Sequence, residues 1–231
     1  MRKLLKVHSD FVSSSRVEPG GDQWLKPGLR KYACELTVDT NTVNTNLKLS
    51  DNNRKVTFET EEQPHPDHPE RFDYCQLLCR TGLTGRHYWE VEWTGGVYLS
   101  VAYKGITRKG YSDDCLFGGN HQSWSLRCSD EGFSVWHNKR RTDLRSSPSS
   151  SPASSFPSSS SSSPNPSFPS SSSSVSHRVA VYVDCPAGTL SFYRVSCDTL
   201  IHLHTFNATF TEPLHAGFGF CSFGSVSLCS V

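Results

Sequence analysis

The stretch GRHYWEVEW, residues 85–93, decides the fold class of this chain. Trp89, Val91 and Trp93 alternate with polar residues, which is the period-2 pattern of a β-strand with one buried and one solvated face. Two indole rings and a valine on one face supply a large apolar area, and aromatic side chains dominate the energetics of a core. The stretch therefore predicts a strand at the centre of a β protein.

The same alternation resumes directly after a glycine pair. Residues 94–96 (Thr-Gly-Gly) interrupt the pattern, and residues 97–103 (VYLSVAY) then alternate again. Two alternating runs joined by a short link that contains glycine are typical of a β-hairpin. We therefore expect two antiparallel strands here, with a turn at 94–96.

The rest of the chain consists of short alternating runs separated by turn residues. Its 16 glycines and 13 prolines among 231 residues suit many short strands, and no stretch shows a convincing helical period. Further strands are predicted at 34–38, 47–49, 55–58, 74–80, 124–128, 133–136, 178–184, 188–193, 201–206, 217–221 and 226–229. This number and spacing of strands predict an all-β fold, a two-layer antiparallel β-sandwich.

Two segments lie outside this pattern. Residues 1–31 have no sustained period and are expected to be an N-terminal linker or tail, so that the domain spans 32–231. Residues 146–176 contain 20 serines and 6 prolines, and such a composition cannot bury enough apolar surface to offset its ordering entropy. We expect a disordered, low-complexity insertion inside the domain, because clear strands follow it.

Charge and composition argue against several classes of partner. The formal net charge of +1 gives no electrostatic case for nucleic acid or for an anionic membrane surface. No run approaches the roughly 20 apolar residues of a membrane span, and the apolar run after Met1 is too short for a signal peptide. The nine cysteines are odd in number and mostly lie in apolar strand patterns, which favours free thiols in a reducing, cytoplasmic compartment.

Residues with catalytic potential are better explained without catalysis. Glu90 and Glu92 lie two apart on a predicted strand, so both carboxylates are expected on its solvated face rather than in an acid–base pair. The chain has no Gly-x-Ser-x-Gly elbow, P-loop or dinucleotide-binding fingerprint. We therefore expect no enzyme activity and no cofactor.

A metal site is the other chemical possibility. His65 and His68 precede Cys75 and Cys79 at a spacing that could hold zinc. The histidines lie in a loop broken by prolines, however, and Cys79 follows two leucines in a predicted strand, which favours a buried thiol. No metal site is predicted.

Four motifs resemble the signature segments of a known family and occur in the family's order. Residues 36–50 resemble the opening PRY motif, 83–93 the central SPRY strand, 181–193 the third signature and 213–218 the closing one. The chain thus resembles a B30.2 (PRY–SPRY) domain, with PRY over about 32–80 and SPRY over about 81–231. The resemblance implies a concanavalin-like jelly roll, most similar to the C-terminal domains of fish NOD-like receptors, tripartite-motif proteins and stonustoxin-like proteins.

The resemblance also implies a module that recognises a protein partner through its inter-strand loops. In the family, ligands lie on a surface shaped by such loops where PRY meets SPRY, and Arg and Tyr often anchor interfaces. Trp124 and Phe218 have a second interpretation as core packing. The candidate partner-binding residues are Arg71, Phe72, Arg108, Lys109, Tyr111, Trp124 and Phe218.

The biological role implied by the resemblance is innate-immune sensing or ubiquitin-ligase targeting. Two alternatives remain open. The chain could be an accessory domain of a toxin or membrane-associated protein of the stonustoxin type. It could also be a fragment of a longer NOD-like receptor, because nucleotide-binding, leucine-rich-repeat, RING and coiled-coil regions are missing from it. The sequence leaves the oligomeric state open.

Overall fold

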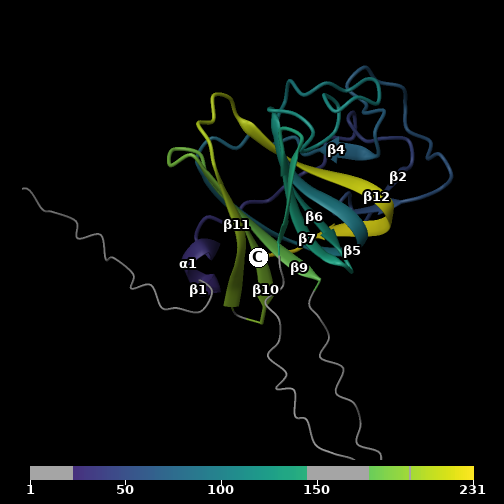
Figure 1. Ribbon diagram of the computed structural model, residues 1–231. Helices are drawn as coiled ribbons and strands as arrows, with labels where there is room; N and C mark the ends of the chain where they lie inside the picture. The colour runs from purple at the N-terminus through teal and green to yellow at the C-terminus, as the bar shows by residue number, and fades with distance from the viewer. Residues whose placement is uncertain (1–22, 145–176, 198) are drawn as a thin grey trace, which may run out of the picture.

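Residues 23–144, 177–197 and 199–231 are described by the computed structural model, and they form an all-β, largely antiparallel fold (Figure 1). The antiparallel sandwich expected from the sequence is confirmed, whereas the predicted insertion 146–176 lies outside the described residues. The elements are β1 (Gln23–Leu25), α1 (Lys26–Arg30), β2 (Leu47–Ser50), β3 (Lys55–Phe58), β4 (Gln76–Leu78), β5 (Arg86–Tyr103), β6 (Ser123–Ser129), β7 (Gly132–His137), β8 (Arg140–Leu144), β9 (Arg178–Asp184), β10 (Thr189–Ser196), β11 (Thr199–Asn207) and β12 (Leu214–Leu228).

β5 is a single strand of 18 residues, so the predicted hairpin across residues 94–96 is wrong. The chain bends there instead of reversing. Gly95 has a φ of 68°, and the register of β12 beside it shifts between Phe220 and Gly224. A Cβ atom at Gly95 would lie 1.8 Å from the carbonyl oxygen of Phe223. Glycine is required here because the two backbones approach too closely for a side chain.

The bend lets β5 and β12 belong to both layers of the sandwich. The first half of β5 pairs with β9 and its second half with β6, while β12 follows the opposite edge of β5 along both halves. What we call the first layer therefore has the order β1-β11-β10-β9-β5-β12-β3-β2. The second layer has the order β8-β7-β6-β5-β12-β4.

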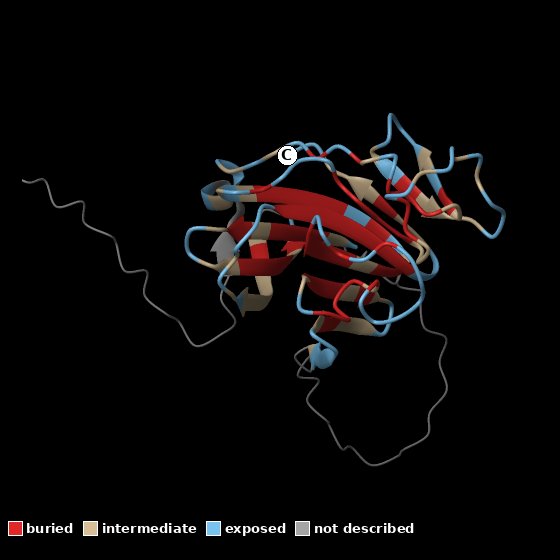
Figure 2. Ribbon diagram, turned by 90° about the horizontal axis from the view of Figure 1, so that it is seen from above, coloured by how far each residue is buried: buried red, intermediate tan, exposed pale blue. Residues whose placement is uncertain are grey.

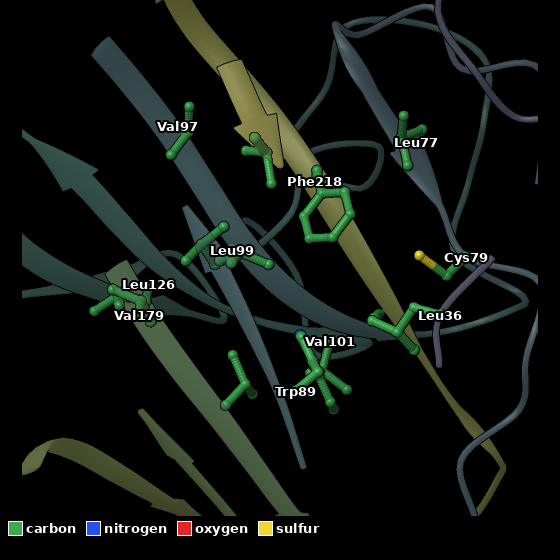
Figure 3. Close-up of a cluster of buried hydrophobic side chains, with 14 of the residues drawn as sticks. Leu36, Leu77, Cys79, Trp89, Val97, Leu99, Val101, Leu126, Val179 and Phe218 are labelled. Atoms are coloured by element: carbon green, nitrogen blue, oxygen red, sulfur yellow. The ribbon is translucent and has the colours of Figure 1, made fainter. Parts of the chain in front are cut away.

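The main core lies between these two layers. Figure 2 shows the central ribbons as buried, and Figure 3 shows apolar side chains from several strands converging there. Trp89, Val91 and Trp93 are at most 4% exposed, as their alternation predicts. They share this core with Leu99 of the second half of β5 and with Phe218 of β12. One continuous apolar cluster thus joins both layers.

Within the first half of β5, residues 88–91 are buried on both faces, which the alternation did not reveal. Glu90 is 1% exposed, and the Tyr88 hydroxyl donates to its carboxylate over 2.6 Å. The Arg178 guanidinium lies 3.4 Å from the same carboxylate. The expectation of a solvated face is therefore wrong for Glu90, whereas Glu92 is exposed as expected. A buried carboxylate needs such partners, because burying an isolated charge is very costly.

The cover over this outer face comes from the N-terminal part of the described chain. Leu29 and Tyr32 pack against an apolar cluster that contains Tyr88, and the Tyr88 amide donates to the Tyr32 carbonyl over 2.8 Å. β1 adds to the edge of β11. Residues 23–31, within the predicted linker, thus form β1 and the short helix α1, where no helix was expected. The predicted domain boundaries themselves stay a prediction.

Two of the shorter predicted elements show how far local sequence patterns predict the structure. The hairpin of β2 and β3 turns through Asp51, Asn52 and Asn53, which all have positive φ and are residue types that tolerate it. The predicted strand 34–38 is wrong as a continuous strand, because this stretch makes only an isolated bridge at Val38. Its period-2 burial is nevertheless present, with Leu36 and Val38 buried.

Candidate functional site

Two long loops, residues 59–75 and 104–122, meet at one end of the sandwich (Figure 1). Asp73 joins them, because its carboxylate accepts from the Gly110 amide over 2.7 Å and lies 3.3 Å from the Lys109 ammonium. The hydrogen bond from Gly110 lowers the pKa of the Asp73 carboxyl, although burial acts in the opposite direction. The two loops therefore form one structural unit.

Buried arginines hold this unit from the inside. Arg71 is 5% exposed, and its guanidinium donates to the carbonyl group of Val43. The Arg108 guanidinium lies 4.5 Å from the centroid of the Phe72 ring and donates to the carbonyl group of Lys104 over 2.7 Å. Burial lowers the pKa of the Arg108 guanidinium. Three candidate residues, Arg71, Phe72 and Arg108, thus support the loops and offer little surface to a partner.

Trp124 and Phe218 belong to the core rather than to the surface. The Trp124 ring stacks on the His137 ring with centroids 4.8 Å apart, and Trp124 is buried. Phe218 is buried among the core side chains drawn in Figure 3. Of the two interpretations that the sequence left open, core packing is the one that agrees with this burial.

Lys109 and Tyr111 are the candidate residues that lie on the surface. Tyr111 is 74% exposed, and its ring packs edge-on against Tyr74 with centroids 5.4 Å apart. The Tyr74 hydroxyl also donates to the Tyr111 carbonyl over 2.6 Å. Lys109 forms the ion pair with Asp73 described above. We call Asp73, Tyr74, Lys109 and Tyr111 the loop surface.

A second group of surface side chains, which the sequence analysis missed, lies on the outer face of the second layer. The Trp136 ring lies 6.4 Å from the Tyr98 ring and 5.6 Å from the Arg141 guanidinium. Arg127 of β6 lies directly opposite Tyr98 of β5 in the antiparallel pairing of these two strands. We call Tyr98, Arg127, Trp136 and Arg141 the sheet surface. The available signal was a tryptophan directly after the buried Val135, hence on the opposite face of its strand.

The loop 104–122 connects the two surfaces. The Lys139 amide donates to the Gly118 carbonyl, and the Lys139 ammonium lies 3.3 Å from the Asp113 carboxylate. Gly118 packs so closely on Trp136 that a Cβ atom at Gly118 would lie 2.6 Å from the Trp136 Cβ. The same loop therefore carries Tyr111 and contacts Trp136, so the loop surface and the sheet surface flank one rigid connection.

Comparison with known families identifies this architecture. A model described as "PRY: SPRY-associated domain" matches residues 36–83, and a model described as "SPRY domain" matches residues 86–229. The second match alone covers more than half of the chain. The chain belongs to the SPRY domain family. The resemblance to a B30.2 (PRY–SPRY) domain that the sequence motifs indicated is thus confirmed.

Similar proteins include both toxin subunits and tripartite-motif proteins. "Stonustoxin subunit alpha" of Synanceia horrida is 38% identical over 190 residues, which cover 81% of this chain and 24% of that protein. "Tripartite motif-containing protein 16" of Mus musculus is 35% identical over 192 residues, which cover 81% of this chain and 30% of that protein. The chain therefore spans 24–30% of the length of these relatives.

Solved structures agree with the family assignment. The "Stonustoxin structure" matches with a TM-score of 0.72 at 36% identity, over 88% of this chain and 30% of that chain. The "Crystal structure of TRIM65 PSpry domain" matches with a TM-score of 0.71 at 24% identity, over 94% of this chain and 98% of that chain. The second match shows that this SPRY domain shares the TRIM65 fold.

The metal motif weighed in the sequence is not assembled by the described part of the SPRY domain. One ring nitrogen of His65 lies 2.7 Å from the Leu47 carbonyl oxygen, and burial raises the pKa of the Cys79 thiol to about 12. Within residues 23–144, 177–197 and 199–231, no three His, Cys, Asp or Glu side chains gather as metal ligands. In the same ranges, no helix has the length and apolar character to cross a membrane.

Proposed function

We propose that this SPRY domain is a non-enzymatic module that binds a protein partner through the loop surface and the sheet surface. The observation that carries the proposal is the exposure of Tyr111 beside a sheet face that bears Trp136 and Arg141. Tyrosine, tryptophan and arginine are the residue types that carry most of the binding energy at protein interfaces. Both surfaces flank one loop, so a single partner can contact them together.

The interior of the loops supports this proposal. Arg71 and Arg108 donate to the loop carbonyls of Pro66 and Lys104, and Asp73 connects one loop to the other. A loop that is already ordered loses less conformational entropy when a partner binds. The exposed side chains are thus presented on a prepared framework, as in other folds that carry binding residues on loops.

For the biological role, we propose cytoplasmic action in innate-immune sensing or in target selection by a ubiquitin ligase. The similarity to "Tripartite motif-containing protein 16" supports this choice. The step is one of analogy, because a fold hosts many functions and the site decides among them. Under this proposal, the domain contributes partner recognition and another part of a larger assembly contributes the response.

A second candidate function follows from the toxin relatives. The 38% identity with "Stonustoxin subunit alpha" favours an accessory domain of a toxin or membrane-associated protein. A domain of a longer NOD-like receptor would use the same binding chemistry as the first proposal. The toxin alternative can be distinguished by experiment, because it predicts that the chain associates with lipid vesicles.

Affinity capture with the whole chain tests the first proposal. Wild-type protein is compared with Tyr111→Ala and Trp136→Ala, and with Phe223→Ala as a matched control. Phe223 is an aromatic residue that is 70% exposed and packs on Phe58 in another part of the molecule. A partner identified by mass spectrometry is then purified and titrated against all four proteins.

We expect at least one of the two site variants to weaken binding about tenfold or more, because hot-spot truncations cost about 2 kcal/mol or more. Phe223→Ala should bind as wild type. Equal affinity in all four proteins would contradict the assigned surfaces. Co-sedimentation of the wild-type chain with phosphatidylcholine–phosphatidylserine vesicles, without a specific protein partner, would favour the toxin alternative instead.

A further inference from the structure

β8 is an edge strand whose outer side no other described strand covers. It runs from Arg140 to Leu144, pairs only with β7, and has four exposed residues among its five. The unpaired N–H and C=O groups of such an edge can accept a further strand. Natural edge strands are often protected by charged side chains or by proline. Whether β8 can pair therefore depends on how its charges meet those of a second strand.

The β7–β8 hairpin determines which backbone groups of β8 point outwards. The turn residues 138–139 have φ angles of 48° and 65°, as in a two-residue type I′ turn, and they join His137 to its ladder partner Arg140. The pair that closes such a turn exchanges backbone hydrogen bonds, and the pattern then alternates along the strand. The N–H and C=O groups of Arg141 and Asp143 therefore face the open edge.

The charges at these two positions are self-complementary. Arg141 and Asp143 flank Thr142 and form an ion pair of 2.6 Å with each other within one chain. A second β8 placed antiparallel about Thr142 also brings each Arg141 opposite Asp143 of the partner subunit. Oppositely charged residues that face each other across antiparallel strands stabilise the pairing. We propose that β8 pairs with β8 of a second copy of this chain, which forms a symmetric dimer with one continuous sheet.

This pairing would bring two recognition sites together. Arg141 belongs to the sheet surface and lies 5.6 Å from the Trp136 ring. A two-fold axis through paired strands keeps the same face of both sheets on the same side, so the two sheet surfaces would lie next to each other. Asp143 of the partner subunit would then border each surface. A partner with two docking points would bind such a pair more tightly, because binding at one surface raises its effective concentration at the other.

The dimer is expected to be weak. One short strand pair contributes less than the about 1,200 Å² that stable complexes bury. Its formation therefore has to be measured at high protein concentration. The measurement needs no partner, so failure of the dimer and failure of the proposed partner binding are separate results.

Analytical ultracentrifugation of the whole chain from micromolar to millimolar concentration tests the proposal. The variants are Arg141→Asp, Asp143→Arg and the double exchange Arg141→Asp/Asp143→Arg. Arg140→Asp is the matched control, because it makes the same change of charge at a position whose backbone groups face β7. Circular dichroism establishes that each variant is folded.

Wild type and the double exchange should dimerise with similar dissociation constants. Each single reversal should weaken the dimer about tenfold or more, because two facing pairs change from attraction to repulsion. Arg140→Asp should have the smallest effect. A wild-type chain that stays monomeric at millimolar concentration would overturn the proposal, and so would single reversals that dimerise as well as wild type.

Discussion

The two halves of β5 have the same alternating sequence pattern but lie in different surroundings. On the outer face of the first half, Tyr88 is buried beneath the N-terminal segment, and Glu90 is buried beside Arg178. On the outer face of the second half, Ser100 and Ala102 are buried as well, and Tyr98 stays half-buried beside Trp136. Alternation thus identifies the residues that share a face, and it does not reveal whether a further segment covers that face. Among the described residues, the proposed recognition surface lies around Tyr98, where this cover is incomplete.

The largest expected effect comes from the core that both halves share. Trp89→Ala should lower the free energy of unfolding by about 3–5 kcal/mol, because truncation of a buried aromatic side chain leaves a cavity. Trp136→Ala, a tryptophan on the open face, is the matched control and should cost much less. Denaturant unfolding followed by circular dichroism measures both. Equal losses would contradict the distinction between the buried and the open face.

Tyr88→Phe is a smaller change that acts on the covered face alone. It removes the hydroxyl that donates to the Glu90 carboxylate and leaves the ring in place. We expect a loss of about 1–3 kcal/mol, because a buried charged acceptor loses a hydrogen bond that water cannot replace. The same unfolding measurement detects it. An unchanged free energy of unfolding would mean that water reaches Glu90 in solution.

The covered face should also respond to acid through Asp184. Burial alone would raise the pKa of the Asp184 carboxyl, but hydrogen bonds from Arg86 and from the Ala187 amide outweigh this and lower the pKa. A lowered pKa in the folded state means stability that is present above the unfolded-state pKa of about 3.9 and lost as the pH falls through the lower value.

Asp184→Asn should therefore reduce the free energy of unfolding at neutral pH by on the order of 1 kcal/mol. The further decrease of this free energy below about pH 4 should be smaller in the variant than in wild type. Thermal unfolding of both proteins as a function of pH measures this. Arg80→Ala, which removes a looser surface ion pair of 3.9 Å with Asp39, is the control and should leave the acid response unchanged. Parallel curves for wild type and Asp184→Asn would show that Asp184 contributes nothing to acid unfolding.

The fold class and the core face of β5 could be predicted because both depend on local alternation. The continuity of β5 could not be predicted, because Thr94-Gly95-Gly96 suits a tight turn as well as a bend. Only the backbone of Phe223, which lies more than a hundred residues further along the chain, selects the bend. The burial of Glu90 has the same kind of cause, since Arg178 and Cys229, which contact it, are distant in sequence.

Whether the candidate residues bind a partner stays a prediction, and only their places in the fold can be compared with the structure. Lys109 and Tyr111 lie on the loop surface, but Arg71 and Arg108 face inwards, where loop carbonyls accept hydrogen bonds from their terminal guanidinium nitrogens. A single arginine in a loop gives no indication of which of these two uses it has. Trp136 was not among the candidate residues, although its place in the alternation after Val135 put it on the outer face of its strand.

The smallest expected effect sharpens the comparison between the two halves of β5. Tyr98→Phe makes the same substitution as Tyr88→Phe, on the same strand and the same face, ten residues further on. We expect less than about 0.5 kcal/mol, because a half-buried hydroxyl on an open face can exchange its contacts with water. The two variants are measured side by side by denaturant unfolding. A loss for Tyr98→Phe as large as that for Tyr88→Phe would mean that the outer face of the second layer is also covered in solution. The sheet surface would then be closed to a protein partner, and recognition would have to depend on Tyr111 and the loop surface alone.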